Sequence, residues 1–221
     1  MRFAKTGRAR FIAHLDTLGV LVRAVRRTGY QLAFTEGMRP KPLLSLALPL
    51  GVGVEGEDEI CDFSLRQRVP LSEFSRRLNQ ELPEGIRLKS FSPSYESKSA
   101  SRVTGASYRI RLANPGEDWQ EAAAAYSQEN DLVVLRHRPK GDKEVNVKKY
   151  VKSVHIADDG SARFEMLVTS EGTARPEEVI SLLEKFAGRK MEAVRVIRTG
   201  ITLGEKRPPA PAGKRRRLQR W

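Results

Sequence analysis

The first 91 residues carry hydrophobic positions whose spacing changes between that of a strand and that of a helix. Helical spacing is clearest between His14 and Thr28, where Leu15, Leu18, Val22 and Val25 recur every three to four residues. The pattern predicts a β-α-β-β-α-β succession, which is the order of a ferredoxin-like or split βαβ unit. The expected elements are strand 1–5, helix 14–28, strand 43–50, strand 59–65, helix 71–82 and strand 86–91.

The same succession returns in the second half of the chain. The expected elements there are strand 108–112, helix 118–126, strand 132–136, strand 162–169, helix 176–186 and strand 194–198. An additional segment, 142–156, interrupts this second unit and is expected to form a hairpin or a short helix. The sequence therefore predicts an α+β protein with two tandem ferredoxin-like (split βαβ) domains.

The domain boundaries follow from composition. Residues 92–105 contain five serines, a proline and a glycine, which is typical of a linker. We expect a first domain at 1–91, a second domain at 106–200 and a C-terminal tail at 201–221. The end of the tail, EKRPPAPAGKRRRLQRW, has too few apolar residues to bury a core, so we expect it to be disordered.

The cysteine and histidine content excludes several kinds of chemistry. With Cys61 alone, the chain has no internal disulfide, which fits the cytoplasm, and it cannot hold an iron–sulfur cluster. The three histidines, His14, His137 and His155, lack zinc-site spacing. We therefore expect no metal and no cofactor on this chain. No apolar run approaches the roughly 18–20 residues of a membrane span, and the first residues do not resemble a secretory signal.

The positive charge lies at the two ends of the chain. Residues 1–41 contain nine Lys/Arg against two Asp/Glu (+7), and residues 205–221 contain seven against one (+6). Residues 42–204 are balanced, so these two segments account for the net charge of +13. Clustered cations gain affinity for nucleic acid through counterion release. We expect the two basic segments to form one face that binds RNA.

The candidate RNA-contacting side chains belong to four segments: the glycine turn after the first strand, the first helix, the loop before residue 43 and the tail. They are Lys5, Arg8, Arg10, His14, Arg23, Arg27, Arg39, Lys41, Lys214, Arg215, Arg216, Arg217, Arg220 and Trp221. Trp221 could stack on a base. His14 is either a structural residue of the helix start, or an exposed group that binds phosphate or acts as a general base. In the catalytic alternative, Lys5 stabilises the developing charge.

The N-terminal half also carries a recognisable pattern. The matching positions are Arg2, Phe3, Lys5, Gly7, Phe11, His14, Leu15, Asp16, Arg23, Arg26, Arg27, Gly29 and the stretch Ala47 through Val52. On these residues the chain resembles the bacterial radical-SAM-linked protein family, a domain of unknown function found fused to or beside B12-binding radical-SAM proteins. The chain departs from the pattern at Ala13, where the family has serine, and at the loop 38–41, where the family has F-N-P-H.

The resemblance implies a radical-SAM protein as a partner, with the iron–sulfur cluster, S-adenosylmethionine and cobalamin all on that partner. The leading hypothesis is an RNA-binding accessory protein, without catalytic activity of its own, that presents rRNA or tRNA to this enzyme. One alternative is a metal-independent endoribonuclease with His14 as general base, by fold-level analogy with CRISPR repeat-processing endonucleases. Another is a protein-interaction scaffold for the radical-SAM partner.

Overall fold

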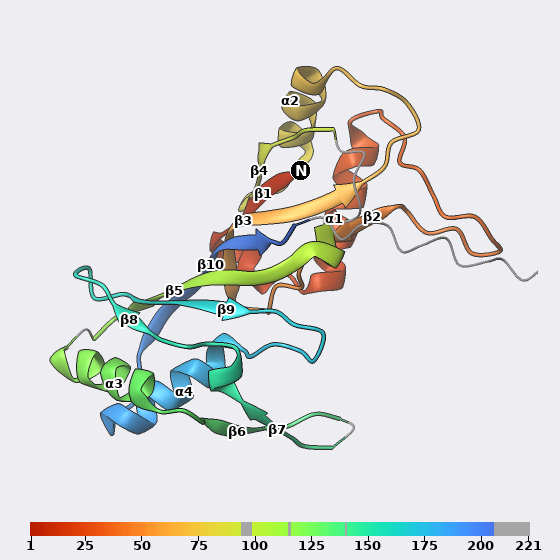
Figure 1. Ribbon diagram of the computed structural model, residues 1–221. Coiled ribbons are helices and arrows are strands. Elements are labelled where there is room, and N and C mark those ends of the chain that lie inside the picture. Colours follow the sequence, from red (N-terminus) through yellow and green to blue (C-terminus); the bar gives the residue numbers. More distant parts are fainter. Residues whose placement is uncertain (94–98, 115, 140, 206–221) are drawn as a thin grey trace, which may run out of the picture.

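The computed structural model describes residues 1–93, 99–114, 116–139 and 141–205. In this part of the chain, four α-helices pack against a mainly antiparallel β-sheet (Figure 1). The α+β class expected from the hydrophobic pattern is therefore confirmed. The expected disorder of residues 206–221 lies outside the described residues.

Over residues 1–93, the structure contains four strands, two α-helices and a short 3-10 helix. They are β1 (Arg2–Lys5), the 3-10 helix η1 (Gly7–Phe11), α1 (His14–Arg27), β2 (Leu44–Leu46), β3 (Val54–Phe63), α2 (Leu71–Glu81) and β4 (Ile86–Ser90). Of the four positions that define the helical spacing, Val25 is buried, Leu18 and Val22 are partly buried, and Leu15 is exposed. The buried side of α1 is centred on Leu21, Ala24 and Val25. The helix ends before Gly29, whose φ of +86° is favourable only for glycine.

Among its described residues, the second half contains six strands, two α-helices and two short 3-10 helices, η2 and η3. Its elements are η2 (Ser99–Arg102), β5 (Val103–Leu112), α3 (Glu117–Gln128), β6 (Val133–Arg136), β7 (Lys143–Asn146), η3 (Val147–Lys149), β8 (His155–Ile156), β9 (Ala162–Leu167), α4 (Pro176–Ala187) and β10 (Ala193–Leu203). Pro176 begins α4, where its missing N–H costs nothing. The Glu178 carboxylate accepts a hydrogen bond from the Arg175 N–H (2.8 Å) and so caps this end of the helix.

One continuous sheet joins the two halves of the chain. Its strand order is β4-β1-β3-β10-β5-β9-β8, and β2 pairs with the far end of β3. The last strand, β10, lies between β3 and β5. It runs parallel to β3, with Val196 opposite Val54, and antiparallel to β5, with Val196 opposite Ile110. The two halves therefore share one sheet, because β10 of the second half pairs with β3 of the first half.

All four α-helices lie on one face of this sheet. Phe3 and Cys61 point into a core with α1 and α2, while Ile110 and Met166 point into a core with α3 and α4. Glu59 is directly opposite Phe3, and Arg198 is directly opposite Tyr108, so each side chain lies on the same face as its neighbour. Because Glu59 and Arg198 form an ion pair, the two cores lie on the same side of the sheet. The opposite face of β3, β10, β5 and β9 has no helix in front of it (Figure 1).

A buried ion pair joins the two halves on the helix-covered face. Arg198 of β10 is 1% exposed and donates Nε and Nη2 to the two carboxylate oxygens of Glu59 (2.8 and 2.5 Å). Its Nη1 and Nη2 also donate to the carbonyls of Pro49 and Leu48 (both 2.9 Å). Burial opposes the Arg198 charge, but the hydrogen bonds and the attraction of Glu59 outweigh it, so the pKa of Arg198 is raised.

Lys5 is a second cation in this buried cluster. Burial lowers its pKa, while the Glu59 carboxylate acts in the opposite direction. Gly56 leaves room for the shared carboxylate, because a Cβ there would lie 2.5 Å from the Glu59 side chain. Each buried charge of the cluster has hydrogen-bond or ion-pair partners, which is the condition under which buried charges are tolerated.

Several element predictions need correction. The expected strand 132–136 forms as β6, but it pairs with β7 in a separate two-stranded sheet, and β8 occupies the edge of the main sheet. The additional segment 142–156 contains β7, η3 and β8. β5 begins at Val103, inside the expected linker, and β10 continues to Leu203, inside the expected tail. Pairing across the sheet lengthens both strands beyond their hydrophobic signal.

Candidate nucleic-acid interface

Lys5 does not have the predicted surface role. It is 1% exposed, and its Nζ donates to the carbonyl oxygen of Ile12 (2.6 Å). The side chain connects the end of β1 to the start of α1 inside the protein. The structure therefore corrects two predictions for Lys5, the phosphate contact and the charge stabilisation beside His14, because the ammonium group does not meet solvent.

The two arginines of η1 differ in availability. Arg8 is exposed and has no ion pair among the described residues. Arg10 is half-buried: its Nη1 lies 3.2 Å from Glu55 Oε1 and its guanidinium lies over the ring of Phe11, 4.7 Å from the centroid. Much of the Arg10 charge is therefore already compensated within the protein.

His14 begins α1, as the sequence predicts, and is partly exposed. Its Nδ1 atom is buried and has no hydrogen-bond partner among the described residues. Leu15 and Asp16 beside it are exposed. A histidine base is commonly oriented by a hydrogen-bond partner, and the catalytic alternative also places a cation beside it to stabilise the developing charge. The buried Lys5 does not supply that cation.

The basic segments of residues 1–41 lie at opposite ends of β3. Lys5 is opposite Gly56 near the start of β3, and the chain continues from there into η1. The loop containing Arg39 and Lys41 leads into β2, whose Leu44 is opposite Phe63 at the other end of β3. Seven residues of strand correspond to about 23 Å. The expected single face is therefore wrong for these residues, and the two groups of cations must be considered separately.

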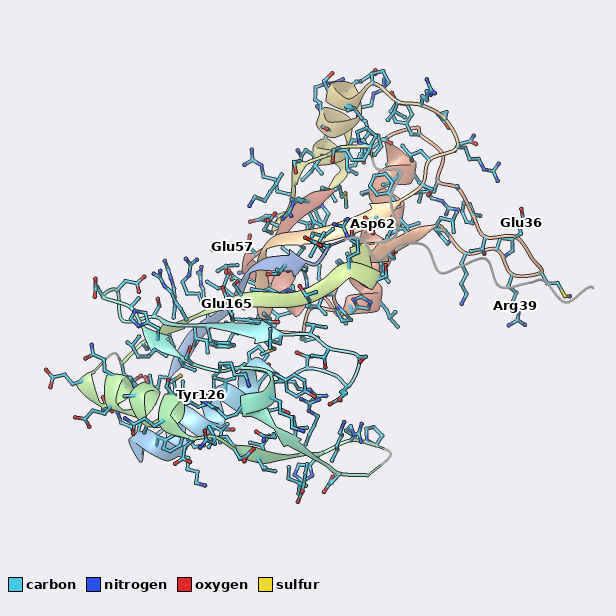
Figure 2. The ribbon with its side chains drawn as sticks, in the orientation of Figure 1. Glu36, Arg39, Glu57, Asp62, Tyr126 and Glu165 are labelled. Carbon is cyan, nitrogen blue, oxygen red and sulfur yellow. The ribbon has the colours of Figure 1, made fainter. Side chains whose placement is uncertain are left out.

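The loop before β2 forms a projecting arm, Phe34–Pro42. An isolated bridge joins Phe34 to Pro42, and the Thr35 N–H donates to the Lys41 carbonyl (2.9 Å). Arg39 and Lys41 are exposed on this arm. Figure 2 shows Arg39 at the outer end of the arm, well away from the sheet.

A second basic loop lies at the base of the arm. Leu32 bridges to Leu65, and the Arg66 N–H donates to the Gln31 carbonyl (2.9 Å). Arg66 and Arg68 are both exposed. Our candidate set omitted these two arginines, because they lie in a charge-balanced part of the sequence. The two closely spaced arginines of Arg66-Gln67-Arg68 are the sequence feature that could have indicated a basic loop here.

The end of α1 completes this basic region. The Arg26 guanidinium lies over the ring of Phe34, 5.8 Å from its centroid, which ties the helix to the arm. Arg23 is on the same side of the helix and exposed. Arg27 instead pairs with Glu81, with 2.7 Å between Nε and Oε2, so its predicted RNA contact would compete with this ion pair.

We use the name arm-end surface for the exposed cations of this region. They are Arg23, Arg26, Arg39, Lys41, Arg66 and Arg68. None of the six has a carboxylate within ion-pair distance in the described part of the chain. The arm itself carries one acidic residue, Glu36 (Figure 2). This end of the molecule is therefore strongly cationic, which is an arrangement that attracts polyanions.

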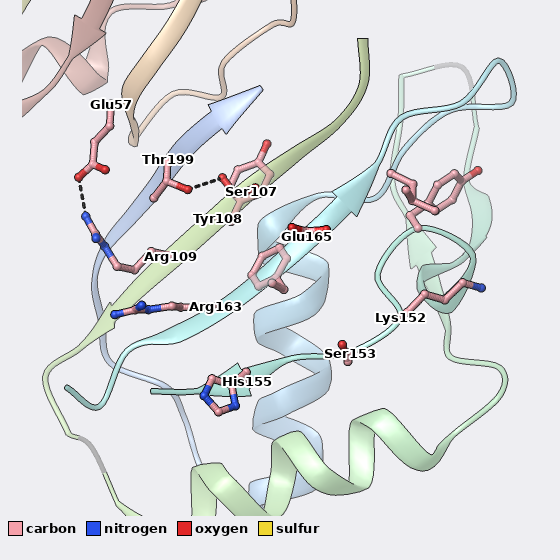
Figure 3. A pocket seen from close by; sticks show the side chains of 13 residues that line it. Glu57, Ser107, Tyr108, Arg109, Lys152, Ser153, His155, Arg163, Glu165 and Thr199 are labelled. Atoms are coloured by element: carbon pink, nitrogen blue, oxygen red, sulfur yellow. Dashed lines mark hydrogen bonds and ion pairs between the residues drawn. The ribbon is translucent and has the colours of Figure 1, made fainter. Parts of the chain in front are cut away.

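The uncovered face of the sheet contains a pocket of about 640 Å³, lined by both charged and apolar side chains (Figure 3). Arg109 of β5 and Arg163 of β9 are directly opposite each other in its floor, and His155 of β8 is opposite Arg163. Lys152 and Ser153 border the other side (Figure 3). We call this the sheet pocket. Sequence reasoning missed it, because the register that aligns these residues is not visible in a single sequence.

The six predicted RNA contacts of the C-terminal tail have no counterpart in the described part of the structure. Lys214, Arg215, Arg216, Arg217, Arg220 and Trp221 lie outside the described residues. Where the structure is described, no three His, Cys, Asp or Glu side chains are grouped as metal ligands. None of the described helices has the length and hydrophobicity that a bilayer-crossing helix needs.

The fold and its basic surfaces define the class of protein: an α+β protein with one helix-covered sheet and two cationic regions. The chain belongs to a bacterial family described as an uncharacterized protein conserved in bacteria (DUF2344), whose family model matches residues 1–176. No curated protein matches the chain. The expectation of a bacterial domain of unknown function is thus confirmed, whereas the link to radical-SAM proteins stays a prediction.

Proposed function

We propose that this protein is an RNA-binding accessory protein that presents rRNA or tRNA to a radical-SAM partner enzyme. The observation that supports it is the arm-end surface, where six exposed cations lack carboxylate partners among the described residues. Cations without carboxylate partners repel one another when they lie on one surface. Phosphate groups of RNA would neutralise them, and the counterions released from the RNA would favour binding. The projecting arm lets Arg39 and Lys41 reach a backbone groove that a flat surface would not enter.

The partner enzyme enters the proposal through the resemblance stated above. An accessory role fits a chain whose candidate catalytic pair is not assembled, because Lys5 is buried and bonded to a carbonyl. Under this proposal the protein acts in the cytoplasm, and the iron–sulfur cluster, S-adenosylmethionine and cobalamin belong to the partner. The charge-balanced second half of the chain is then available for contact with the enzyme.

We also infer that the two halves are tandem ferredoxin-like units that share one sheet. In each half the first strand lies between the third and the fourth: β1 lies between β3 and β4, and β5 lies between β9 and β10. Each half also places two helices on one side. This order is that of a split βαβ unit, with the β6–β7 hairpin inserted into the second copy.

A filter-binding titration of tRNA and of an rRNA fragment across a salt series tests the proposal. Six phosphate contacts predict a slope of log K against log salt of about −4 to −5. The arm variant replaces four cations with glutamine and should lower the magnitude of the slope by about 3. Its substitutions are Arg39→Gln, Lys41→Gln, Arg66→Gln and Arg68→Gln.

A matched control removes the same charge from exposed positions elsewhere. Its substitutions are Arg87→Gln, Arg138→Gln, Lys149→Gln and Lys185→Gln. The control should retain most of the wild-type slope. RNA binding that is absent at low salt, or lost equally in both variants, would refute the role of the arm-end surface. RNA cleavage in EDTA that disappears in His14→Ala would instead favour the endoribonuclease.

A further inference from the structure

The floor of the sheet pocket brings like charges together. Arg109 and Arg163 are directly opposite each other on adjacent antiparallel strands, and both side chains project from the uncovered face. Like charges in directly opposite positions destabilise a sheet. A second such pair, Arg111 opposite Arg195, lies next to them on β5 and β10. Four arginines thus occupy neighbouring positions on three strands.

The carboxylates nearby compensate this charge only in part. Arg109 Nη2 donates to Glu57 Oε1 (2.5 Å), but its buried Nε has no acceptor among the described residues. Arg163 Nη2 donates to Asp159 Oδ2 (3.1 Å) in an exposed pair, where ion pairing contributes little. A buried donor without an acceptor is rare and calls for an explanation, and binding of an anion is one such explanation. The pocket therefore has donor capacity left for an anion.

The rest of the pocket fits an anion that is part of a larger molecule, because its lining combines polar side chains with Tyr150, Phe164 and Leu167. His155 adds further nitrogen donors at its border, and Ser153 lies between His155 and Lys152, whose side chain points away from the two arginines (Figure 3). Glu165, on β9 two residues after Arg163, can accept hydrogen bonds from hydroxyl groups. A volume of about 640 Å³ leaves room for considerably more than a phosphate group alone.

We propose that the sheet pocket binds the phosphate of a phosphomonoester, with Arg109 and Arg163 as its main ligands. Two arginines side by side match the oxygens of a dianionic phosphate better than isolated cations do. The group comes either from a free nucleotide or from the terminal phosphate of an RNA. This site is separate from the arm-end surface and does not depend on it.

Isothermal titration calorimetry of the full chain at constant ionic strength tests the proposal with AMP, adenosine and inorganic phosphate. AMP should bind and adenosine should not. Arg163→Gln should weaken AMP binding at least about tenfold, the typical cost of one charge-assisted hydrogen bond. Arg87→Gln, on the same uncovered face but on β4, is the matched control and should leave AMP binding unchanged. A thermal melt of each variant confirms that it is folded.

Two RNA decamers that differ only in a 5′-phosphate or 5′-hydroxyl distinguish the two sources. If the 5′-phosphate increases the affinity of the decamer and Arg163→Gln abolishes this increase, the ligand is an RNA end. If AMP binds but the 5′-phosphate does not increase the affinity of the decamer, the ligand is a free nucleotide. If AMP, inorganic phosphate and the phosphorylated decamer all fail to bind, or bind equally to Arg163→Gln, the site is refuted. The arm variant should keep AMP binding, and Arg163→Gln should keep the RNA salt slope, so the two proposals fail independently.

Discussion

Replacing Glu59 with glutamine removes the carboxylate that pairs with Arg198 and also attracts the Lys5 charge inside the protein. The substitution keeps the shape of the side chain, so the backbone of β3 need not move. It leaves two buried cations, each about 1% exposed, without a counterion. The carbonyls of Leu48 and Pro49 still accept from Arg198, but they carry no full charge.

The expected loss is large, because breaking a buried ion pair costs about 3–5 kcal/mol. A domain of ordinary stability has only about 5–15 kcal/mol in total. Removing both partners, as in Glu59→Leu/Arg198→Met, should cost less than the sum of the single changes by at least about 1 kcal/mol. This difference measures the penalty of an uncompensated buried charge.

The assay is urea unfolding followed by circular dichroism and by Trp119 fluorescence, in a Trp221→Phe background so that Trp119 alone emits. Circular dichroism reports on both halves, while Trp119 reports on the core of the second half. Since the pair joins β3 to β10, the two signals should change together in the wild-type protein.

The pH dependence gives a second readout. Burial lowers the pKa of Lys5 from 10.5, so between the lowered pKa and pH 10.5 the unfolded chain binds more protons and this group's contribution to stability increases with pH. Loss of Glu59 lowers the Lys5 pKa further. The difference in free energy of unfolding between wild type and Glu59→Gln should therefore become smaller as the pH rises toward 10. A cost below about 1 kcal/mol, or a deficit indifferent to pH, would refute the account of a shared carboxylate.

Two other predictions concern single residues. Burial raises the pKa of the Cys61 thiol to about 12, so Ellman's reagent should not react with it at pH 8 until urea unfolds the protein. Because the unfolded thiol ionises near pH 9, its contribution to stability should be lost between pH 9 and 12, as alkaline unfolding curves of wild type and Cys61→Ala would show. Gly85→Ala places a Cβ 2.5 Å from the Thr6 carbonyl at a φ of +83° and should cost more than about 2 kcal/mol. Gly141→Ala, with a φ of +103° and no neighbour within 4 Å, is the control and should cost less in the same urea experiment.

The helices could be predicted from the sequence more fully than the strands. The periodicity of α1 and the prolines before α2 and at the start of α4 define helix limits locally, so those predictions agree with the structure to within a few residues. β10 continues five residues past the expected end because β5 pairs with it along that length. The position of β6 in a separate hairpin also depends on tertiary pairing, which hydrophobic periodicity does not encode.

The candidate site could be predicted only in part for the same reason. Arg39 and Lys41 lie on an exposed arm, as a loop with two prolines suggests. The prediction for Lys5 was wrong because its neighbours resemble a surface turn, whereas in the folded chain its ammonium group is buried against the Ile12 carbonyl and feels the charge of Glu59, 54 residues away. Arg66 joins the basic region through a contact with Gln31 that only the folded chain creates.

The central place of β10 has a consequence for biosynthesis. As the ribosome extends the chain, β3 and β5 emerge long before the strand that separates them, and both expose unpaired edges during that interval. Such edges invite association between nascent chains. Ribosome-bound intermediates that stop before residue 193 should therefore recruit chaperones, and release of the last strand should end that dependence.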